Sequence, residues 1–395
     1  MFVYLDNSAT TKQYDVVTDK MIQYMREDFG NPSSLHRLGI NAEKAIKNAR
    51  KQVASAMNVQ DAEIIFTSGG TEADNTALIG AAMAKKRRGN RIITTKIEHP
   101  AVLETVAKLE RQGFEVLYLD IDDKGCVDMA SLENSWNEDT ILVSVMGVNN
   151  EVGTIQPIKE IIAMKERFNK DKGCETLLHT DMVQALGKIP MNMRGIDLAA
   201  VSAHKIHGPK GMGALYLRKG LTIEPYMIGG GQEKHMRSGT ENVAGIVGFG
   251  EAAHQAESKF ESRVQNMDKA RNYLLEGIKA EIKDIKINGC EETSLIGEGG
   301  KCCPSVLNVS FVGTRGEVLL HTLETSGIYV STGSACSSNK KGQSHVLKTM
   351  GLKDKEIEGA LRFSFSEFNT IEEMDYVLDN LKNAVGKFRK LGSFR

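Results

Sequence analysis

Short apolar runs and amphipathic stretches alternate along the first part of the chain. Apolar, largely β-branched runs predict strands at residues 63–66, 91–95, 115–119, 141–146, 176–179, 198–202 and 213–217. Between them, apolar and capping patterns predict helices at Glu72–Ala84, from Pro100 to just before Gly113, and at about 157–169. This alternation predicts an α/β fold in which helices cover a mostly parallel sheet.

The pattern changes near residue 255. A long charged amphipathic helix is predicted at about 256–285, then a strand at 305–311, a helix at 315–326, a strand at 328–330 and a closing helix from about Ile371. These elements predict a second, smaller α+β domain, and no flexible linker marks the change.

Composition narrows the class of protein. The chain has 395 residues, too many for one core of ordinary size, so we expect one large and one small domain, or two to three domains. Hydrophobic residues make up 41% and charged residues 26%, which is typical of a soluble globular protein. The net charge of −1 indicates neither nucleic acid nor an anionic membrane as a partner.

Targeting signals and cysteine spacing point to an intracellular protein. The first residues do not resemble a signal peptide, and no apolar run is long enough to span a bilayer. Cysteines stand at positions 126, 174, 290, 302, 303 and 336, and none forms the C-x-x-C pair of a structural zinc site. We therefore expect a cytoplasmic protein without a metal site.

Lys205 is the most informative single residue. It follows the predicted strand 198–202 and precedes Gly208, Pro209 and Gly211, which disfavour a helix and favour tight turns. A lysine in such a place can form a Schiff base with a carbonyl cofactor such as pyridoxal phosphate. The alternative is a surface lysine before a turn, as most lysines are.

Polar residues follow five of the predicted strands, at the sheet edge where open parallel sheets bind ligands. In chain order they are Gly70 and Thr71, then Glu98 and His99, then Asn149, Asn150 and Glu151, then Asp181 and Gln184, and finally His204 and Lys205. Each is compatible with ordinary turn chemistry. Because these residues follow five successive strands, they favour a shared site.

The first of these groups is a candidate phosphate cradle. Gly70 and Thr71 open a predicted helix, whose first backbone N–H groups are free to bind an anion. Ser202 can add a hydroxyl from a neighbouring strand. The segment matches neither the nucleotide motif nor the dinucleotide motif, and an ordinary strand–helix turn is the alternative.

The other groups suit the ring of pyridoxal phosphate. Asp181 can keep the ring nitrogen protonated, and His99 can stack on the ring. Gln184 can donate to the ring hydroxyl, and His204 stands beside Lys205, which supplies the imine. The sequence therefore predicts a pyridoxal phosphate site.

The chain resembles the NifS-like cysteine desulfurases of the class V aminotransferases. The matching segments, in family order, are Tyr4–Thr11, Thr67–Glu72, Glu98–His99, Val148–Gly153, Asp181–Gln184, Ser202–Gly213, Arg237–Asn242, Ser334–Ser338 and Leu361–Ser364. They run from about residue 4 to residue 380. One such motif would be weak, but the ordered set is specific.

The resemblance implies a fold type I transferase that binds pyridoxal 5′-phosphate. A large cofactor-binding domain is expected at 15–255, with a mostly parallel seven-stranded sheet. Residues 1–14 and 256–395 are expected to form the small domain with the catalytic cysteine loop. The family also implies a homodimer with its sites at the subunit interface, in which Thr240 reaches the cofactor phosphate of the other subunit.

The implied reaction converts L-cysteine to L-alanine. Arg362 with Asn150 would hold the substrate carboxylate, and Lys205 would move protons at the α-carbon. Cys336 would attack the substrate sulfur and keep it as a persulfide. His99 would also assist proton transfer near the substrate thiol.

The setting of Cys336 supports this role. Most single cysteines are small buried hydrophobic residues. Residues 331–343 are small and polar, however, which predicts a loop, and Lys340 and Lys341 can lower the pKa of a nearby thiol. Whether an iron–sulfur cluster ever binds Cys336 transiently is open. The other five cysteines are interpreted as structural.

Four departures from the family pattern concern the partner more than the chemistry. Gly70 and Met182 stand where alanine is common, which leaves the chemistry intact. The loop after Cys336 lacks the frequent Leu-Glu-Pro, and Ser366-Glu367 replaces a common Gly-Arg pair. The sulfur acceptor, whether an iron–sulfur scaffold or a tRNA-thiolation enzyme, is therefore left open.

Three alternatives have distinct consequences. A class V transaminase would need a keto acid and no nucleophilic cysteine, and a selenocysteine lyase would differ in its rates on the two substrates. A non-catalytic scaffold for sulfur-transfer partners would bind no cofactor and make no alanine. Lys205, Asp181 and Cys336 argue against the scaffold.

Overall fold

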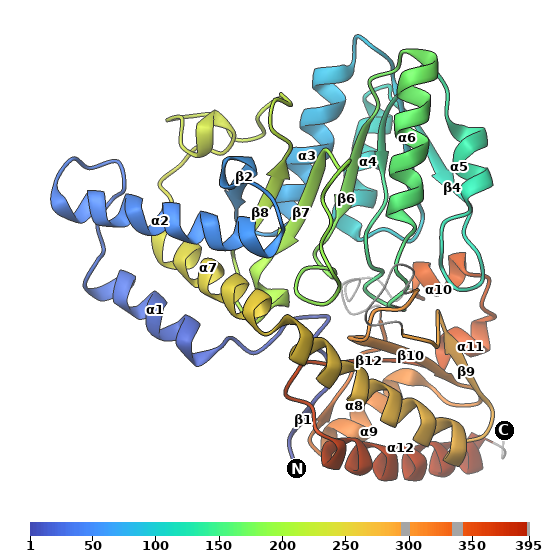
Figure 1. The fold of residues 1–395 in the computed structure, drawn as a ribbon. Coiled ribbons are helices and arrows are strands. Elements are labelled where there is room, and N and C mark those ends of the chain that lie inside the picture. Colours follow the sequence, from blue (N-terminus) through green and yellow to red (C-terminus); the bar gives the residue numbers. More distant parts are fainter. Residues whose placement is uncertain (294–300, 334–342, 393–395) are drawn as a thin grey trace.

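The alternating segments of the first part of the chain form one seven-stranded sheet (Figure 1). The structure is a computed structural model that describes all residues except 294–300, 334–342 and 393–395. In spatial order the strands are β2 (Ile64–Thr67), β8 (Gly213–Leu217), β7 (Leu198–Ser202), β6 (Leu177–Asp181), β5 (Thr140–Ser144), β3 (Arg91–Thr95) and β4 (Glu115–Leu119). Strand β8 is antiparallel to both of its neighbours, β2 and β7, and all other adjacent strands are parallel. The predicted mostly parallel sheet is confirmed.

The strands agree with the predicted ranges to within two residues, and the central strands are buried on both faces. Every residue of β5, β6 and β7 is buried. A strand covered on both sides is a continuous apolar run, which is easy to recognise in a sequence.

Helices cover both faces of this sheet. One face packs against α3 (Gly70–Lys85) and α4 (Pro100–Arg111). The other packs against α2 (Arg37–Ala56), α5 (Met129–Ser135), α6 (Ile158–Lys172) and α7 (Val243–Ser258), and α1 (Asp15–Arg26) lies along α7. Three short 3₁₀ turns, η1 (Asp61–Glu63), η2 (Ala203–Lys205) and η3 (Glu233–His235), complete this part.

The hydrophobic pattern did not identify α1, α2 or α7. In α7 most residues are buried, on all sides of the helix, because it lies between α1, α2 and the sheet. A helix without a polar face has no amphipathic period to detect. The predicted helix at 256–285 begins about four residues too early, because it combined the last turn of α7 with α8 (Phe260–Glu281). It also extends about four residues beyond the end of α8.

The second part of the chain forms a smaller sheet with its own core. Strand β10 (Val306–Phe311) lies between β12 (Ala360–Ser364) and β9 (Ile285–Asn288), and all three are antiparallel. The packed helices are α8, α9 (Gly316–Thr325) and α12 (Ile371–Gly392), and the short helices α10 (His345–Thr349) and α11 (Asp354–Glu358) flank β10 and β12. The predicted smaller α+β unit is confirmed.

The N-terminal segment joins this second core before it crosses to the large sheet. Strand β1 (Val3–Tyr4) pairs in parallel with β11 (Ile328–Tyr329), and the side chains of Val3 and Leu5 are fully buried there. The segment then runs past the carboxyl ends of the large sheet's strands, where the predicted site lies. None of the helices that the structure describes is long and apolar enough to cross a membrane.

Candidate active site

Lys205 lies at the carboxyl edge of the large sheet, at the end of the 3₁₀ turn η2 that follows β7. The turn closes tightly, because a Cβ on Gly208 would come within 2.9 Å of the Ala203 carbonyl oxygen. The Lys205 Nζ donates to the backbone carbonyls of Ser8 (2.5 Å) and Ala9 (2.7 Å). The N-terminal segment therefore holds this half-buried amine at the sheet edge.

Asp181 and His99 belong to the same electrostatic environment as Lys205. Asp181 ends β6 and is buried; its Oδ1 accepts the Val183 N–H at 2.9 Å. Burial raises the pKa of Asp181, and the charges of His99 and Lys205 oppose that rise. The predicted acid, imidazole and lysine thus come together from three different strand ends.

The tautomer of His99 follows from its role as the N-cap of α4. Its Nδ1 accepts the backbone N–H of Ala101 at 3.1 Å, so a neutral ring carries its proton on Nε2. Burial lowers the pKa of His99, which favours this neutral form. The ring therefore offers an N–H donor on Nε2.

A second group of titratable side chains lies buried behind Asp181 and was missed in the sequence. His179 precedes Asp181 by two residues on β6, so both point to the same face of the sheet. Its Nε2 lies 3.3 Å from Oδ1 of Asp74 on α3, and its Nδ1 lies 2.9 Å from Oγ of Ser144. The alignment between His179 and Asp74 is too poor for a hydrogen bond.

Protonation in this buried group favours neutral forms. Burial lowers the pKa of His179 to about 3, and burial with the nearby charge of Asp181 raises that of Asp74. Burial also raises the pKa of Glu98 to about 8, although its Oε1 accepts from Thr95 Oγ1 and the Met146 N–H, both at 3.0 Å. The carboxyl group of Glu98 therefore holds its proton near neutral pH behind the predicted site, and burial favours the protonated form of Asp74 as well.

The predicted phosphate cradle forms where α3 begins. A Cβ on Gly70 would lie 2.7 Å from Cγ2 of Val183 and 3.8 Å from Cβ of Ser202, so the absence of a side chain opens this place. Thr71 is exposed, and the buried Ser202 hydroxyl has only a long contact of 3.5 Å, to the Met212 carbonyl. The first N–H groups of α3 are thus accessible to an anion.

Arg237 lies beside this cradle, a placement that the sequence did not indicate. Its Nε donates to Oε1 of Glu72 in the first turn of α3, at 3.0 Å. Thr240, three residues further on, is exposed, and its side chain makes no hydrogen bond to the described residues of this chain. The segment that carries both residues therefore lies near the phosphate end of the site.

The remaining predicted cofactor residues contact the N-terminal segment. Nε2 of Gln184 donates to the Ser8 carbonyl at 3.0 Å, and Nδ1 of His204 lies 3.2 Å from the Thr10 hydroxyl. Burial lowers the pKa of His204 to about 4, which keeps the ring neutral. The segment around Ser8 and Thr10 therefore covers the edge on which these side chains lie.

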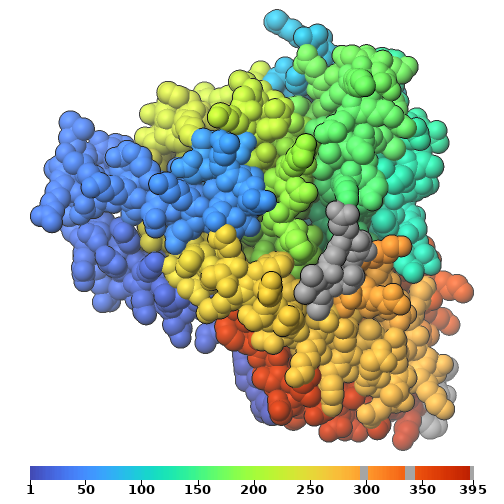
Figure 2. Space-filling model, viewed as in Figure 1, coloured from blue at the N-terminus to red at the C-terminus, as the bar shows by residue number. Residues whose placement is uncertain are grey.

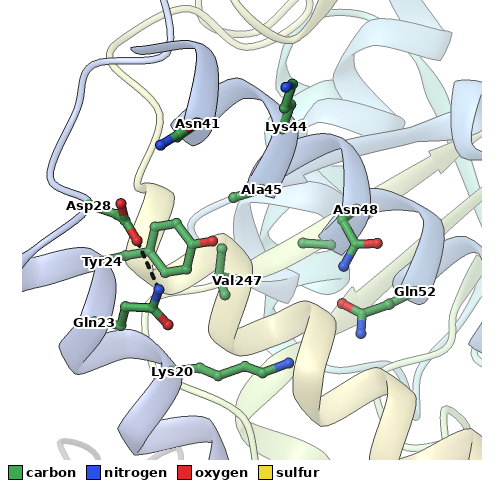
Figure 3. A pocket seen from close by; sticks show the side chains of 11 residues that line it. Lys20, Gln23, Tyr24, Asp28, Asn41, Lys44, Ala45, Asn48, Gln52 and Val247 are labelled. Atoms are coloured by element: carbon green, nitrogen blue, oxygen red, sulfur yellow. Dashed lines mark hydrogen bonds between the residues drawn. The ribbon is translucent and has the colours of Figure 1, made fainter. Parts of the chain in front are cut away.

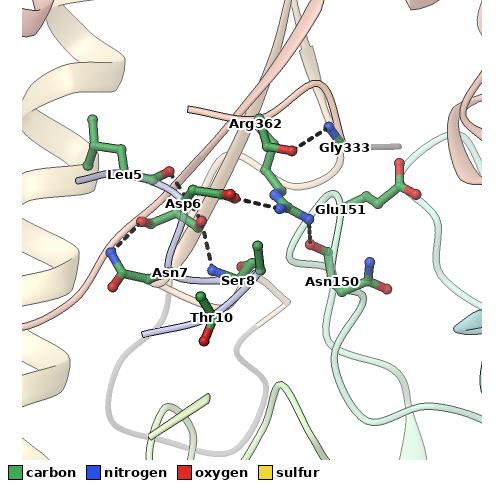
Figure 4. Close-up of polar contacts among 12 residues, drawn as sticks. Leu5, Asp6, Asn7, Ser8, Thr10, Asn150, Glu151, Gly333 and Arg362 are labelled. Atoms are coloured by element: carbon green, nitrogen blue, oxygen red, sulfur yellow. Dashed lines mark hydrogen bonds and ion pairs between the residues drawn. The ribbon is translucent and has the colours of Figure 1, made fainter. Parts of the chain in front are cut away.

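Arg362 reaches the site from β12 of the smaller sheet (Figure 4). Its Nη2 pairs with Oδ1 of Asp6 at 2.8 Å, and its Nη1 donates to the backbone carbonyl of Asn150 at 3.1 Å. Nε has no hydrogen-bond partner among the described residues. Asn150 was expected to bind substrate beside Arg362; in this structure it positions the guanidinium through its backbone, and Asp6 is a counter-ion that the sequence analysis missed.

Cys336 lies outside the described residues, but the residues that flank its segment are next to the site. Ser344 donates to Oε2 of the buried Glu151 at 2.5 Å, and a Cβ on Gly333 would come within 2.9 Å of the same oxygen. Nε2 of His345 donates to the backbone carbonyl of Glu98 at 3.1 Å. Gly333 and Ser344 therefore both lie beside Glu151, and His345 lies beside Glu98, two residues of the predicted rim.

The other cysteines do not form a reactive or metal-binding group in the part of the chain that the structure describes. Burial raises the pKa of Cys302 to about 12, so this thiol stays protonated. Residues 1–293, 301–333 and 343–392 contain no cluster of three His, Cys, Asp or Glu side chains suited to a metal ion.

A separate hollow lies between α1, α2 and α7 (Figure 3). Polar side chains such as Lys20, Asp28 and Asn41 line it, and none of the predicted site residues is among them. This hollow is distinct from the predicted site.

Comparison with known proteins agrees with the geometry of the site. The family described as "Aminotransferase class-V" matches residues 3–377. The chain is 44% identical to "Cysteine desulfurase IscS" of Clostridium botulinum (strain Hall) over 391 residues, with 98% of this chain and 96% of that protein covered. It is 46% identical to the protein of the same name from Methanosarcina thermophila over 391 residues, with 98% and 93% covered. A solved structure titled "NIFS-LIKE PROTEIN" superposes with a TM-score of 0.89 at 41% identity and covers 98% of this chain and 100% of that one.

Proposed function

The chain belongs to the class-V aminotransferase family, and we propose that it is a pyridoxal 5′-phosphate-dependent cysteine desulfurase. The observation that carries this proposal is the meeting of Lys205, Asp181 and His99 at one sheet edge, in a chain similar over its whole length to desulfurases. The enzyme converts L-cysteine to L-alanine and transfers the sulfur to an acceptor.

The residues present fit the cofactor. Gly70 leaves open the space that a Cβ would fill at the start of α3, where the N–H groups, Thr71 and Ser202 would hold the phosphate. The buried carboxyl of Asp181 suits a protonated ring nitrogen, because a cation beside it would restore the charged form that burial disfavours. When bound, the cofactor supplies an electron sink for the bonds at the substrate's α-carbon.

Four further side chains would orient the ring and its carbonyl carbon. The amine of Lys205 would bind the carbonyl carbon, and the His99 ring would stack on the cofactor. Gln184 would donate its NH₂ group to the ring hydroxyl, and the neutral ring of His204 would close the site beside Lys205. Lys205, Gln184 and His204 also contact the N-terminal segment, which covers this edge.

Substrate binding depends on Arg362. The side chain is buried and its Nε is available, so a substrate carboxylate could add to the pairing with Asp6 or replace it. Asn150, whose backbone carbonyl orients the guanidinium, would offer its side-chain amide to the same carboxylate. The amine of Lys205, once released, would move the proton at the α-carbon.

Sulfur transfer is assigned to Cys336. Its thiolate attacks the substrate sulfur, an S–S bond forms and the carbon–sulfur bond breaks. The electron pair of the broken bond stays with the substrate carbon, which takes up a proton and leaves as alanine. His99, whose Nε2 carries the proton of the neutral ring, would assist proton transfer near the substrate thiol by donating from that nitrogen. The product on the enzyme is a Cys336 persulfide.

Two variants test these assignments. Lys205→Ala should abolish the visible absorption of the lysine-bound cofactor together with activity. Cys336→Ala should keep the absorption and lose sulfide release and persulfide, as followed by mass spectrometry. Desulfuration by Cys336→Ala at the wild-type rate would overturn the choice of nucleophile, and transamination that persists in this variant would favour a transaminase.

We further propose that the enzyme is a homodimer, with Thr240 directed to the cofactor phosphate of the second subunit. Apolar side chains are exposed near the N-terminal helices and in the segment after β8: Leu35 is 95% exposed, Phe29 67% and Ile228 84%. In Figure 2 the N-terminal helices, in blue, project to one side of the molecule. Light scattering should give twice the mass of the chain, and Thr240→Ala should weaken cofactor retention.

The proposal includes a division of the chain and a sulfur acceptor. Residues 15–255 would form the cofactor-binding domain, and 1–14 with 256–395 the small domain. The acceptor would be a protein, either an iron–sulfur scaffold or a tRNA-thiolation enzyme, in the cytoplasm. Capture of partners after loading with cysteine, followed by mass spectrometry of persulfides, would identify it and show whether a cluster contacts Cys336.

A further inference from the structure

We infer that Lys188 is a positioning residue of this reaction, because its ammonium group orients the side-chain amide of Gln184 toward Lys205 and the cofactor ring. The inference rests on the proposed function, since it concerns the same site. Lys188 was not among the residues that the sequence indicated, and it touches neither the predicted phosphate cradle nor Arg362 in the hydrogen bonds of the described residues.

The contacts form a short chain that leads to Lys205. Nζ of Lys188 donates to Oε1 of Gln184 at 2.6 Å, and Nε2 of Gln184 donates to the Ser8 carbonyl at 3.0 Å. Nζ of Lys205 donates to that same carbonyl at 2.5 Å. Lys188 is thus connected to Lys205 through one amide and one backbone carbonyl.

The backbone places the two side chains of this pair. Gln184 and Lys188 lie in successive turns after β6, closed by the hydrogen bonds from Leu186 N to the Met182 carbonyl and from Lys188 N to the Ala185 carbonyl. Gly187, with a φ of 69°, reverses the chain between them, and the two side chains meet. Both are buried, with 5% and 4% of their surface exposed, so water competes little for their polar groups.

Lysine is the residue type that selects one orientation of the amide. An amide can rotate by half a turn and exchange its oxygen and its NH₂ group with almost no change of shape. An ammonium group can only donate hydrogen bonds, so it pairs with Oε1 and not with the NH₂ group. The NH₂ group therefore points away from Lys188, toward Ser8 and the ring hydroxyl that Gln184 is proposed to bind.

Lys188 also adds positive charge near Lys205. Burial lowers the pKa of Lys188 to about 7, with further lowering by Lys205, Arg263 and Arg362 and an opposing effect of Cys303. The charge of Lys188 also adds to the effect of burial that lowers the pKa of His204 and of His207, whereas His99 and Asp181 interact with Lys205. The selection of one amide orientation belongs to the charged form of Lys188, because a neutral amine can also accept a hydrogen bond.

Two effects of Lys188 act in the same direction on the cofactor-bound enzyme. A hydrogen-bond donor at the ring hydroxyl stabilises the anionic form of that oxygen. The positive charge of Lys188 disfavours a second positive charge on the nitrogen of Lys205. Both disfavour the proton on the nitrogen of Lys205 when the cofactor is bound. Loss of Lys188 should therefore raise the pH at which this proton dissociates.

The test uses Lys188→Met, which keeps the length of the side chain and removes its donors. In the cofactor-loaded protein, titration of the visible absorption should show a midpoint higher by about one pH unit than in the wild type. The kcat should fall about tenfold, with little change in KM, because the substrate contacts at Arg362 are intact. The substitution leaves Oε1 of the buried Gln184 without its donor, so some loss of stability accompanies it.

Two controls separate positioning from a general effect of removing a buried lysine. Lys165→Met removes another buried lysine, which bonds to Asp197 and the Gly195 carbonyl far from this edge, and should leave the midpoint unchanged. Gln184→Leu should raise the midpoint by itself. Adding Lys188→Met to it should then contribute less than Lys188→Met does alone, because the coupling through the amide is already lost.

The outcomes distinguish this inference from the proposed function. A wild-type midpoint in Lys188→Met, or fully additive effects with Gln184→Leu, would overturn the role of Lys188 and leave the desulfurase intact. Failure of the wild-type protein to bind the cofactor or to make alanine from cysteine would remove the proposed function itself. If Lys188→Met does not fold, Lys188→Gln gives the same titration test, with a shift expected because its amide can pair in either orientation.

Discussion

Two buried carboxylates at opposite ends of the large sheet differ in how they are paired. Asp197, just before β7, accepts from Lys165 and Arg218, both at 2.7 Å, and from the Leu178 N–H at 2.8 Å. Glu98, at the carboxyl edge, has one oxygen without a hydrogen-bond partner among the described residues, and burial raises its pKa to about 8. A fully paired acid holds the fold together, whereas an incompletely paired one keeps a proton available.

The largest expected effect comes from the carboxyl edge. Asp181→Asn replaces the acid at the proposed ring nitrogen by a neutral group of the same shape. We expect kcat to fall about a thousandfold, equivalent to ~4 kcal/mol, because the cofactor loses its protonated nitrogen. Steady-state alanine production measures this loss. A variant within about threefold of the wild type would show that Asp181 is a structural acid like Asp197.

Asp197→Asn tests the opposite end of the sheet. The substitution leaves the buried Lys165 without its counter-ion, so the free energy of unfolding should fall by about 3 kcal/mol. Urea unfolding of the cofactor-free protein measures this change. The kcat of the folded, cofactor-loaded enzyme should stay the same, and a large loss of kcat would remove the contrast between the two ends.

Glu98→Gln tests the proton that the carboxyl edge holds. The pKa of Glu98 is raised from 4.5 to about 8, so folding favours its protonated form. Its contribution to stability is complete below pH 4.5 and is lost as the pH rises through about 8. The variant should therefore resemble the wild type at low pH and be more stable than the wild type above the raised pKa. Equal pH dependence in urea unfolding would contradict the buried proton.

The smallest effect is expected for Arg218→Ala. Its side chain is 45% exposed, so solvent screens its pair with Asp197, and Lys165 remains as a second partner. The free energy of unfolding should fall by less than about 1 kcal/mol in the same urea measurement. A loss as large as that of Asp197→Asn would show that Arg218, and not Lys165, balances the acid.

The sequence predicted the large sheet well because its strands are short apolar runs, of which the central ones are buried on both faces. The boundaries of β3, β4, β7 and β8 agree with the predicted ranges. Helix α7 escaped prediction because it is enclosed by α1, α2 and the sheet, so it has no polar stripe. Patterning detects an element only when its two sides face different surroundings.

Within the site, the sequence indicated residues that directly follow strands and missed those that act through other side chains. Asp181, His99 and Lys205 could be placed together because parallel strands end at a common edge. His179 and Asp74 were missed because their contact joins β6 to α3, and Asp6 because its partner Arg362 is 356 residues away. Lys188 was missed because its importance depends on which way the amide of Gln184 points.

The amino-acid sequence by itself determined the α/β architecture and the set of residue types at one edge of the sheet. Local periodicity and strand ends carry that information, because they depend on near neighbours along the chain. Only the tertiary structure decided which groups share a proton or a carbonyl, such as Lys205 and Gln184 at Ser8. Burial and distances of a few ångströms set these interactions, and both arise when distant segments pack together.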